Sequence, residues 1–453
     1  MKRSALLILA SGVWPSLPLY AACLTNSDTV IYAQESYVSK QPPVWQIDGK
    51  NPYAANNTFN DVALNYRNDC TLVEDKLDVD FSLLGLAYYP YKSTGAFEKD
   101  DHRLRALIDK LRLSYTPTES LRLDVGKLRP KGGAFYLKSP ASLLSNYNAG
   151  FKATRINSPD MKPLYTDAFW GAVLAQDTLA YSLSLTAAPR LTPPGPRYES
   201  SGNWNALARS NASDRYLLTY TDYRWGDSTP SVSLMTGDKK SVAVAQTLNV
   251  TPQFILNTEL AYHFQQQWRH LDEKSARDVQ SYRFPDALYS AKDDDGVELA
   301  LGMQYTTDRF SQFGLEYYFQ SEGYSSAQWD KQTELIKFLN PRTNYAPLDR
   351  AFDAYKYLMA SEIYNASSQG NLLGKHYLNA YGSYLMDDQS SVQPFAVMNL
   401  QDKSATVGLN INKPLNPQLE LYGGLYTAFG KSDSEFALFG ETLGTYLGFK
   451  YHL

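Results

Sequence analysis

Alternation between apolar and polar residues, with a period of two, is the feature that most constrains how this chain can fold. The segment KLDVDFSL, beginning at Lys76, places its apolar residues at one parity and its aspartates and serine at the other. The closing segment GTYLGFKYHL, beginning at Gly444, shows nearly the same pattern up to the final residue. A period of two is typical of a β-strand with two different faces. We therefore expect strands rather than helices along most of the chain.

These segments recur, and the connections between them alternate in length. Short turns alternate with intervals that are mostly long, such as 130–166, 265–295 and 322–373. We count about sixteen strands, with fourteen to eighteen compatible with the pattern. The expected strands are 74–89, 107–116, 121–129, 167–175, 179–187, 215–225, 231–237, 241–250, 254–264, 296–306, 312–321, 374–386, 392–400, 405–413, 417–428 and 442–453. Short turns on every second connection are typical of a transmembrane barrel, with its periplasmic turns and extracellular loops.

A soluble β-sandwich is the alternative for the same strands, but it gives no reason for the alternating connections. Several membrane helices are excluded, because each needs about 20 apolar residues in a row. Within lipid, a closed barrel can pair every backbone group. We therefore predict an all-β chain that forms a closed antiparallel transmembrane β-barrel with long extracellular loops. Glycines on the inward face are expected to leave the lumen open, namely Gly302, Gly314, Gly408, Gly424 and Gly448.

The N-terminal part of the chain predicts export from the cytoplasm. Two basic residues, a short apolar stretch and small residues indicate a signal peptide over 1–22. We expect 23–70 to form a periplasmic or plug segment and 71–453 to form the barrel. The two cysteines of the chain, Cys23 and Cys70, favour a disulfide in an exported protein.

A lipid anchor on Cys23 is the alternative to this disulfide. The lipoprotein motif normally has an aliphatic residue three positions before its cysteine, and Tyr20 occupies that position. The sequence therefore favours the disulfide over the lipid anchor.

With these features, the chain resembles a Gram-negative outer-membrane β-barrel. In such proteins the last strand ends in an aromatic residue, with further hydrophobic residues at alternate positions; Leu447, Phe449 and Tyr451 match this spacing, while Leu453 replaces the usual Phe. The segments DVGKLRPKGG and LEYYFQSEGYS are also similar to parts of alginate-export-like, porin-like barrels. The resemblance implies an outer-membrane location. It also implies contact with membrane lipid and lipopolysaccharide, and insertion by the barrel-assembly machinery.

Charged residues on the inward parity are the candidate pore-lining site. They could filter solutes by charge, or they could simply pair across strands and hold the wall together. The expected pore-lining residues are Asp78, Asp80, Lys110, Arg112, Arg122, Asp124, Glu259, Glu298, Glu316 and Glu420. The interval 322–373 has two segments with helical spacing, which could fold into the pore as a constriction or rest on the barrel rim.

A porin-like channel for small polar solutes or an exported saccharide is the function these features favour. The alternatives are a surface-binding, adhesin-like barrel with a closed lumen and a barrel hydrolase. His270 and Asp272 have the residue types of an acid–base pair, but no nucleophile elbow or metal-ligand spacing accompanies them. We therefore expect no catalytic residues, no metal and no cofactor. The net charge of −4 does not indicate the basic surface that nucleic-acid-binding proteins have.

Overall fold

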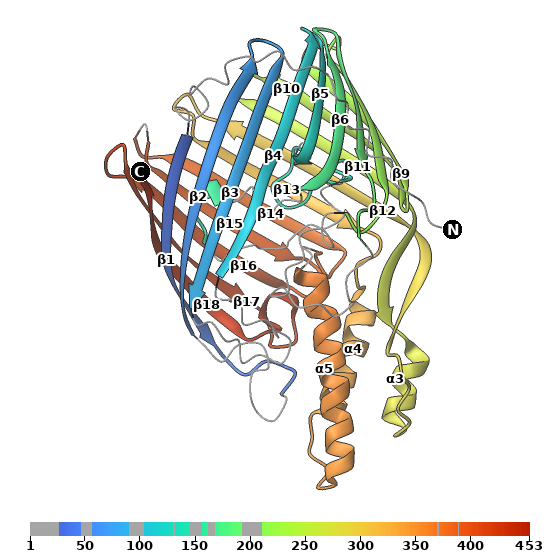
Figure 1. Cartoon of the computed structure of the whole chain (residues 1–453). Coiled ribbons are helices and arrows are strands. Elements are labelled where there is room, and N and C mark those ends of the chain that lie inside the picture. The colour runs from blue at the N-terminus through green and yellow to red at the C-terminus, as the bar shows by residue number, and fades with distance from the viewer. Residues whose placement is uncertain are drawn as a thin grey trace.

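Eighteen strands form one antiparallel sheet that closes into a barrel (Figure 1). The computed structural model describes residues 27–46, 57–89, 104–129, 132–144, 156–161, 168–192, 211–368, 371–387 and 389–453. The strands are β1 (Ser27–Lys40), β2 (Thr58–Val73), β3 (Leu77–Tyr89), β4 (Leu104–Thr118), β5 (Leu121–Leu128), β6 (Phe169–Asp177), β7 (Tyr181–Ala188), β8 (Arg215–Asp222), β9 (Ser228–Gly237), β10 (Lys240–Thr251), β11 (Phe254–Leu271), β12 (Tyr289–Thr306), β13 (Gln312–Gln320), β14 (His376–Leu385), β15 (Ser391–Asn399), β16 (Ser404–Pro414), β17 (Leu419–Phe429) and β18 (Glu441–His452). The helices are α3 (Glu273–Gln280), α4 (Ser326–Leu339), α5 (Ala346–Ser368) and η3 (Glu435–Ala437).

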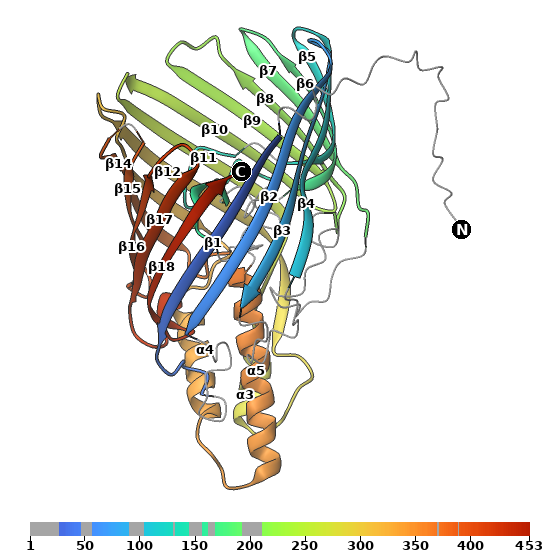
Figure 2. The ribbon, with the colours of Figure 1, turned by 60° about the vertical axis from the view of Figure 1, so that its left-hand side comes forward.

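The barrel closes where β18 pairs with β1, and the two strands lie side by side in Figure 2. The register places Phe449 opposite Ala33 and Tyr446 opposite Ser36. This confirms the predicted closed antiparallel barrel, with eighteen strands instead of about sixteen. The expectation that 23–70 forms a plug or periplasmic segment is wrong for the described residues, because β1 and most of β2 fall in this range and belong to the wall.

The outer face of the barrel is apolar, as the alternation predicted. On β18, Leu447 is 67% exposed and Phe449 and Tyr451 are each 40% exposed, while Tyr446 and Lys450 on the other parity are buried. Leu453 continues the exposed parity at the end of the chain. In water such a belt of exposed large side chains would be unfavourable, whereas in lipid it is the expected surface. The barrel is therefore a membrane-spanning one.

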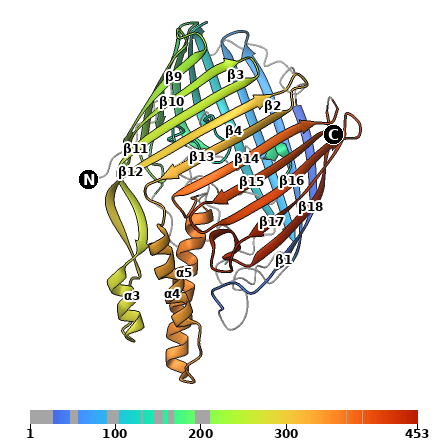
Figure 3. The same ribbon diagram turned by 180° about the vertical axis from the view of Figure 1, so that it is seen from behind.

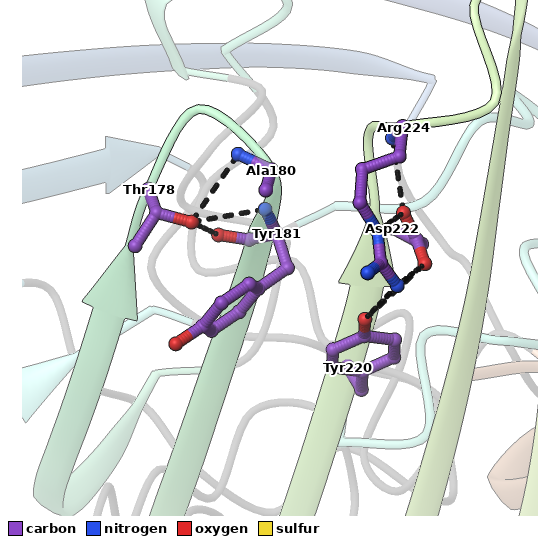
Figure 4. Close-up of polar contacts among 6 residues, drawn as sticks. All are labelled: Thr178, Ala180, Tyr181, Tyr220, Asp222 and Arg224. Carbon is purple, nitrogen blue, oxygen red and sulfur yellow. Dashed lines mark hydrogen bonds and ion pairs between the residues drawn. The ribbon is translucent and has the colours of Figure 1, made fainter.

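Eight short turns, from β2–β3 to β16–β17 at every second connection, lie at one end of the barrel, together with the start of β1 and the end of β18. The opposite end has two short connections as well, β9–β10 and β15–β16. Local hydrogen bonds shape two of the eight turns (Figure 4). The Thr178 hydroxyl accepts from the backbone N–H groups of Ala180 and Tyr181, at 3.3 and 3.0 Å. The Arg224 guanidinium donates to the Asp222 carboxylate at the neighbouring turn. Both sets of hydrogen bonds join residues two or three positions apart, so each turn is stabilised by its own residues.

The opposite end carries the long connections, including the helices. The helical cap, which we define as α3, α4 and α5, projects beyond the rim on the side of β11 to β14 (Figures 1 and 3). Its apolar core includes Leu335, Ile336 and Met359, and it also packs against Trp45 of the β1–β2 connection. Within the described residues, no helix is both long enough and apolar enough to cross a bilayer. The two helices expected in 322–373 are thus confirmed, and they extend outward from the barrel.

Candidate functional site

A loop between β5 and β6 runs inside the barrel and contacts its wall at several places. We call its two described segments, 132–144 and 156–161, the inner loop. The inner loop makes side-chain and backbone contacts with β1, β8, β11, β12, β13 and β18, although only β5 and β6 are its neighbours in sequence. A segment tied to so many strands must occupy part of the lumen.

One end of the inner loop is held by three glutamates that project inward from adjacent strands. Glu259 on β11 accepts hydrogen bonds from Ala134 N at 3.0 Å, the Ser139 hydroxyl at 2.5 Å and Ala141 N at 2.8 Å. All three glutamates are at most 3% exposed. A buried carboxylate is stable only when donors satisfy it, and backbone N–H groups of the inner loop serve this purpose.

The other two glutamates extend this attachment along the wall. Glu316 on β13 accepts from Tyr136 N at 2.7 Å and Leu137 N at 3.0 Å. Glu298 on β12 receives the Lys138 ammonium at 3.2 Å. A run of backbone and side-chain donors from 134 to 141 therefore meets a matching run of acceptors on β11, β12 and β13.

The far end of the inner loop is held by the opposite side of the barrel. Asn157 N donates to the Gln34 amide oxygen on β1 at 2.7 Å. Asp160 forms an ion pair with Lys450 on β18 at 2.7 Å, and Lys450 also lies 3.5 Å from Glu420. The two described segments thus contact the β11–β13 wall and the β1–β18 seam.

Apolar contacts complete the seating of the inner loop. Leu143 and Leu144 are buried with Phe169 and Met235 of the wall. Ile156 and Met161 are fully buried in a second cluster, formed with Val30, Tyr32, Ala63, Leu84, Leu86, Tyr422 and Tyr446. Burial of apolar side chains at several points, in addition to the hydrogen bonds, fixes the inner loop to the barrel wall.

The ten predicted pore-lining residues all fall on the strand face opposite to the apolar one. Asp80 on β3 pairs across strands with Lys110 and Arg112 on β4, as the structural alternative expected, whereas Arg122 and Asp124 pair within β5. The other five predicted residues contact either neighbouring wall residues or the inner loop. Asp78 accepts from the Thr71 hydroxyl, Glu420 pairs with Lys450, and Glu259, Glu298 and Glu316 hold the inner loop. That these residues line a conducting pore stays a prediction.

The segment that enters the lumen belongs to 130–166 and not to 322–373, for which a constriction and a position on the barrel rim were the two alternatives. The helices α4 and α5 instead pack in the cap. Period-two patterns cannot reveal the inner loop, because its polar partners on strands other than β5 and β6 lie between about 70 and 290 residues away along the chain. Its one sequence signal is the run KGGAFYLKS from Lys131, which offers donors but no acid of its own.

The other candidate groups do not come together as a catalytic site. Asp272 accepts from Ser275 N at 2.8 Å and caps α3, while the His270 ring lies 2.9 Å from the Glu322 carbonyl oxygen. Within the described residues, no group of His, Cys, Asp or Glu could hold a metal ion. Cys70 is buried near the end of β2, and Cys23 and the signal peptide lie outside the described residues. The Cys23–Cys70 disulfide stays a prediction.

Comparison with known proteins supports the fold and leaves the sequence family open. No protein-family model matches the chain, and no curated protein sequence matches it. Among solved structures, the chain is similar to Pseudomonas aeruginosa OccK5 (OpdH), with 10% identity over 96% of this chain and 99% of that one and a TM-score of 0.51. It is also similar to Pseudomonas aeruginosa OccK11 (OpdR), with 12% identity over 95% and 96% and a TM-score of 0.50. The chain has the fold of porin-like barrels of the Gram-negative outer membrane.

Proposed function

We propose that the protein is an outer-membrane channel that passes small polar solutes through a lumen narrowed by the inner loop. The observation that carries this proposal is the attachment of the inner loop to both sides of the barrel, through Glu259, Glu298 and Glu316 on one side and Lys450 on the other. A barrel of about sixteen to eighteen strands is wide enough to leave an aqueous channel. A loop fixed inside it sets the size and charge of what can pass.

Planar-bilayer recording of the purified protein tests the proposal. We expect discrete conductance steps in the wild-type protein. The double variant Glu259→Gln/Glu316→Gln should show larger and noisier steps, because an amide NH2 would face backbone N–H donors and release the inner loop. Its free energy of unfolding should fall by about 3 kcal/mol. Glu119→Gln, in the exposed β4–β5 turn, is the matched control and should leave both quantities unchanged.

Folding is checked separately, by heat-modifiable migration and circular dichroism in detergent. A folded barrel without conductance steps would overturn the channel and favour a closed, surface-binding barrel. Conductance that is identical in the double variant and the wild type would show that the inner loop does not limit passage.

A further inference from the structure

The aromatic side chains of the lumen gather on one wall. Tyr381 on β14, Phe395 on β15 and Tyr426 on β17 lie on the inward parity, opposite to exposed apolar neighbours. The inward positions of β7 to β11 instead carry small hydroxyl and amide residues, such as Ser182, Ser184, Thr219, Thr221, Ser233 and Asn257. The lumen therefore has one aromatic wall and one polar wall.

Glycines on neighbouring strands hold these rings flat against the wall. A Cβ atom added to Gly314 would lie 2.2 Å from the ring of Tyr381, and one added to Gly408 would lie 2.4 Å from the ring of Phe395. Gly444 stands in the same relation to Tyr426, at 2.1 Å. The inward glycines that were expected to leave the lumen open thus provide room for rings. Each of the three rings lies over a glycine of a neighbouring strand and remains partly exposed.

The register joins the rings into a row. Tyr381 is opposite Phe395, Phe395 is opposite Gly408, and Gly408 is opposite Tyr426. Tyr136 of the inner loop adds a fourth ring, with its centroid 4.1 Å from that of Tyr381. We call these four residues the aromatic row. Because strands lie about 4.8 Å apart, the part of the row from β14 to β17 extends over about 14 Å.

Exposure shows that the aromatic row faces the lumen and is more than packing. Tyr136 is 67% exposed although it lies on a loop inside the barrel, and Tyr381, Phe395 and Tyr426 are partly exposed. Nearby Tyr422 and Tyr446 are buried beneath Ile156 and Met161 of the inner loop, so they pack in the wall. A large exposed ring at a constriction lies where a passing solute must touch it.

We propose that the aromatic row is a binding track for linear saccharides that pass through the channel. The proposal rests on the proposed function and names its substrate class. The face of an aromatic ring is apolar and carries partial negative charge, so it attracts the C–H groups on the flat face of a sugar ring. The hydroxyl groups at the edge of the sugar need donors and acceptors, which the opposite polar wall supplies. A row of about 14 Å is longer than one sugar ring, which favours oligosaccharides over monosaccharides.

Ion-current block by a defined saccharide tests this proposal. Maltohexaose, cellohexaose and chitohexaose are added as probes to channels in a planar bilayer, and the concentration that halves the current is measured for each. We expect at least one of them to block the wild-type channel. The double variant Tyr136→Ala/Tyr381→Ala should need about tenfold more of that saccharide, because two stacking faces are lost. The matched control is Tyr384→Ala on the same strand, which removes an outward ring that is 52% exposed and should not change the block.

The outcomes separate the two proposals. Absence of conductance in a folded barrel overturns the channel itself, and with it the track. Normal conductance without block by any of the three saccharides overturns the track and leaves the channel standing. Block that is equally strong in the double variant, or block by succinate in place of the saccharides, also overturns the track, because recognition would then not depend on the rings.

Discussion

At the scale of single residues, buried carboxylates hold the loops of this barrel in place. Glu435 of η3 lies at the outer end and accepts from Leu373 N at 2.7 Å, the Tyr377 hydroxyl at 2.6 Å and the Asn399 amide at 2.7 Å. It thereby joins the β17–β18 loop to the β13–β14 loop and to two strands. Burial raises the pKa of Glu435 to about 7; the three hydrogen bonds lower it, and the charge of nearby Asp402 raises it.

We expect this junction to loosen as the pH rises. The pKa of Glu435 is higher in the folded protein than its ordinary value of 4.5, so the stability it contributes is present at acidic pH and is lost as the pH increases from about 4.5 to about 7. Hydrogen exchange of residues 430–440, measured between pH 5 and 8, should therefore accelerate with pH beyond the intrinsic chemical rate. Glu435→Gln should remove this excess. If hydrogen exchange accelerated equally with pH in the variant and the wild type, Glu435 would not be the group that loosens the junction.

A second residue-scale prediction concerns the glycines under the aromatic rings. Gly444→Val should lower the free energy of unfolding by about 1 to 3 kcal/mol, because its side chain would meet the ring of Tyr426 and force the ring away. Gly85→Ala on β3 is the matched control, since its added Cβ would meet only the Leu64 carbonyl at 3.9 Å. Urea unfolding in lipid vesicles measures both variants. A neutral Gly444→Val would show that the ring has free space.

Residue parity could be predicted from the sequence, whereas residue partners could not. The inward positions of Glu259, Glu298 and Glu316 follow from the period of two. Their partners come from a loop more than 100 residues earlier, and no periodic pattern relates the two. The role of these glutamates in holding the inner loop therefore became visible only with the fold.

At the scale of elements, β1 is a strand whose two faces differ little in polarity. On β1 the inward residues include Val30 and Tyr32, which pack against Ile156 and Met161 of the inner loop. Its outward face includes Glu35. Because these inward residues contact protein and not water, they are apolar. The sequence of β1 therefore lacks the difference in polarity between its inward and outward faces that marks the predicted strands. This is the physical reason why β1 was assigned to a plug segment.

The helical cap provides a test at the same scale. Replacement of residues 326–368 by a short Gly-Ser linker removes α4 and α5 but leaves every strand and the inner loop intact. We expect the barrel to fold and its conductance to change by less than about twofold, because the narrowing lies at the inner loop. Planar-bilayer recording and heat-modifiable migration are the measurements. A severalfold rise in conductance would instead assign the constriction to the cap.

At the scale of the whole molecule, the apolar belt fixes how the barrel sits in the membrane. Leu447→Arg places a charge in the middle of β18, on the lipid side, and should lower the free energy of unfolding by about 2 to 4 kcal/mol. Leu453→Arg, at the end of the chain, should cost about 0 to 1 kcal/mol. Urea unfolding in vesicles compares the two. Equal costs would contradict the proposed depth of these positions.

The closed barrel as a whole could be predicted from alternation, connection lengths and the even strand number. Its seam has a consequence for the order in which the molecule is made. The last strand, β18, pairs with the first one, β1, and Asp28 meets His452 at 3.0 Å across 424 residues. Contacts of such sequence separation form only after a large loop has closed. A chain that lacks its last strand therefore leaves both edges of the sheet unpaired and open to pairing with other chains.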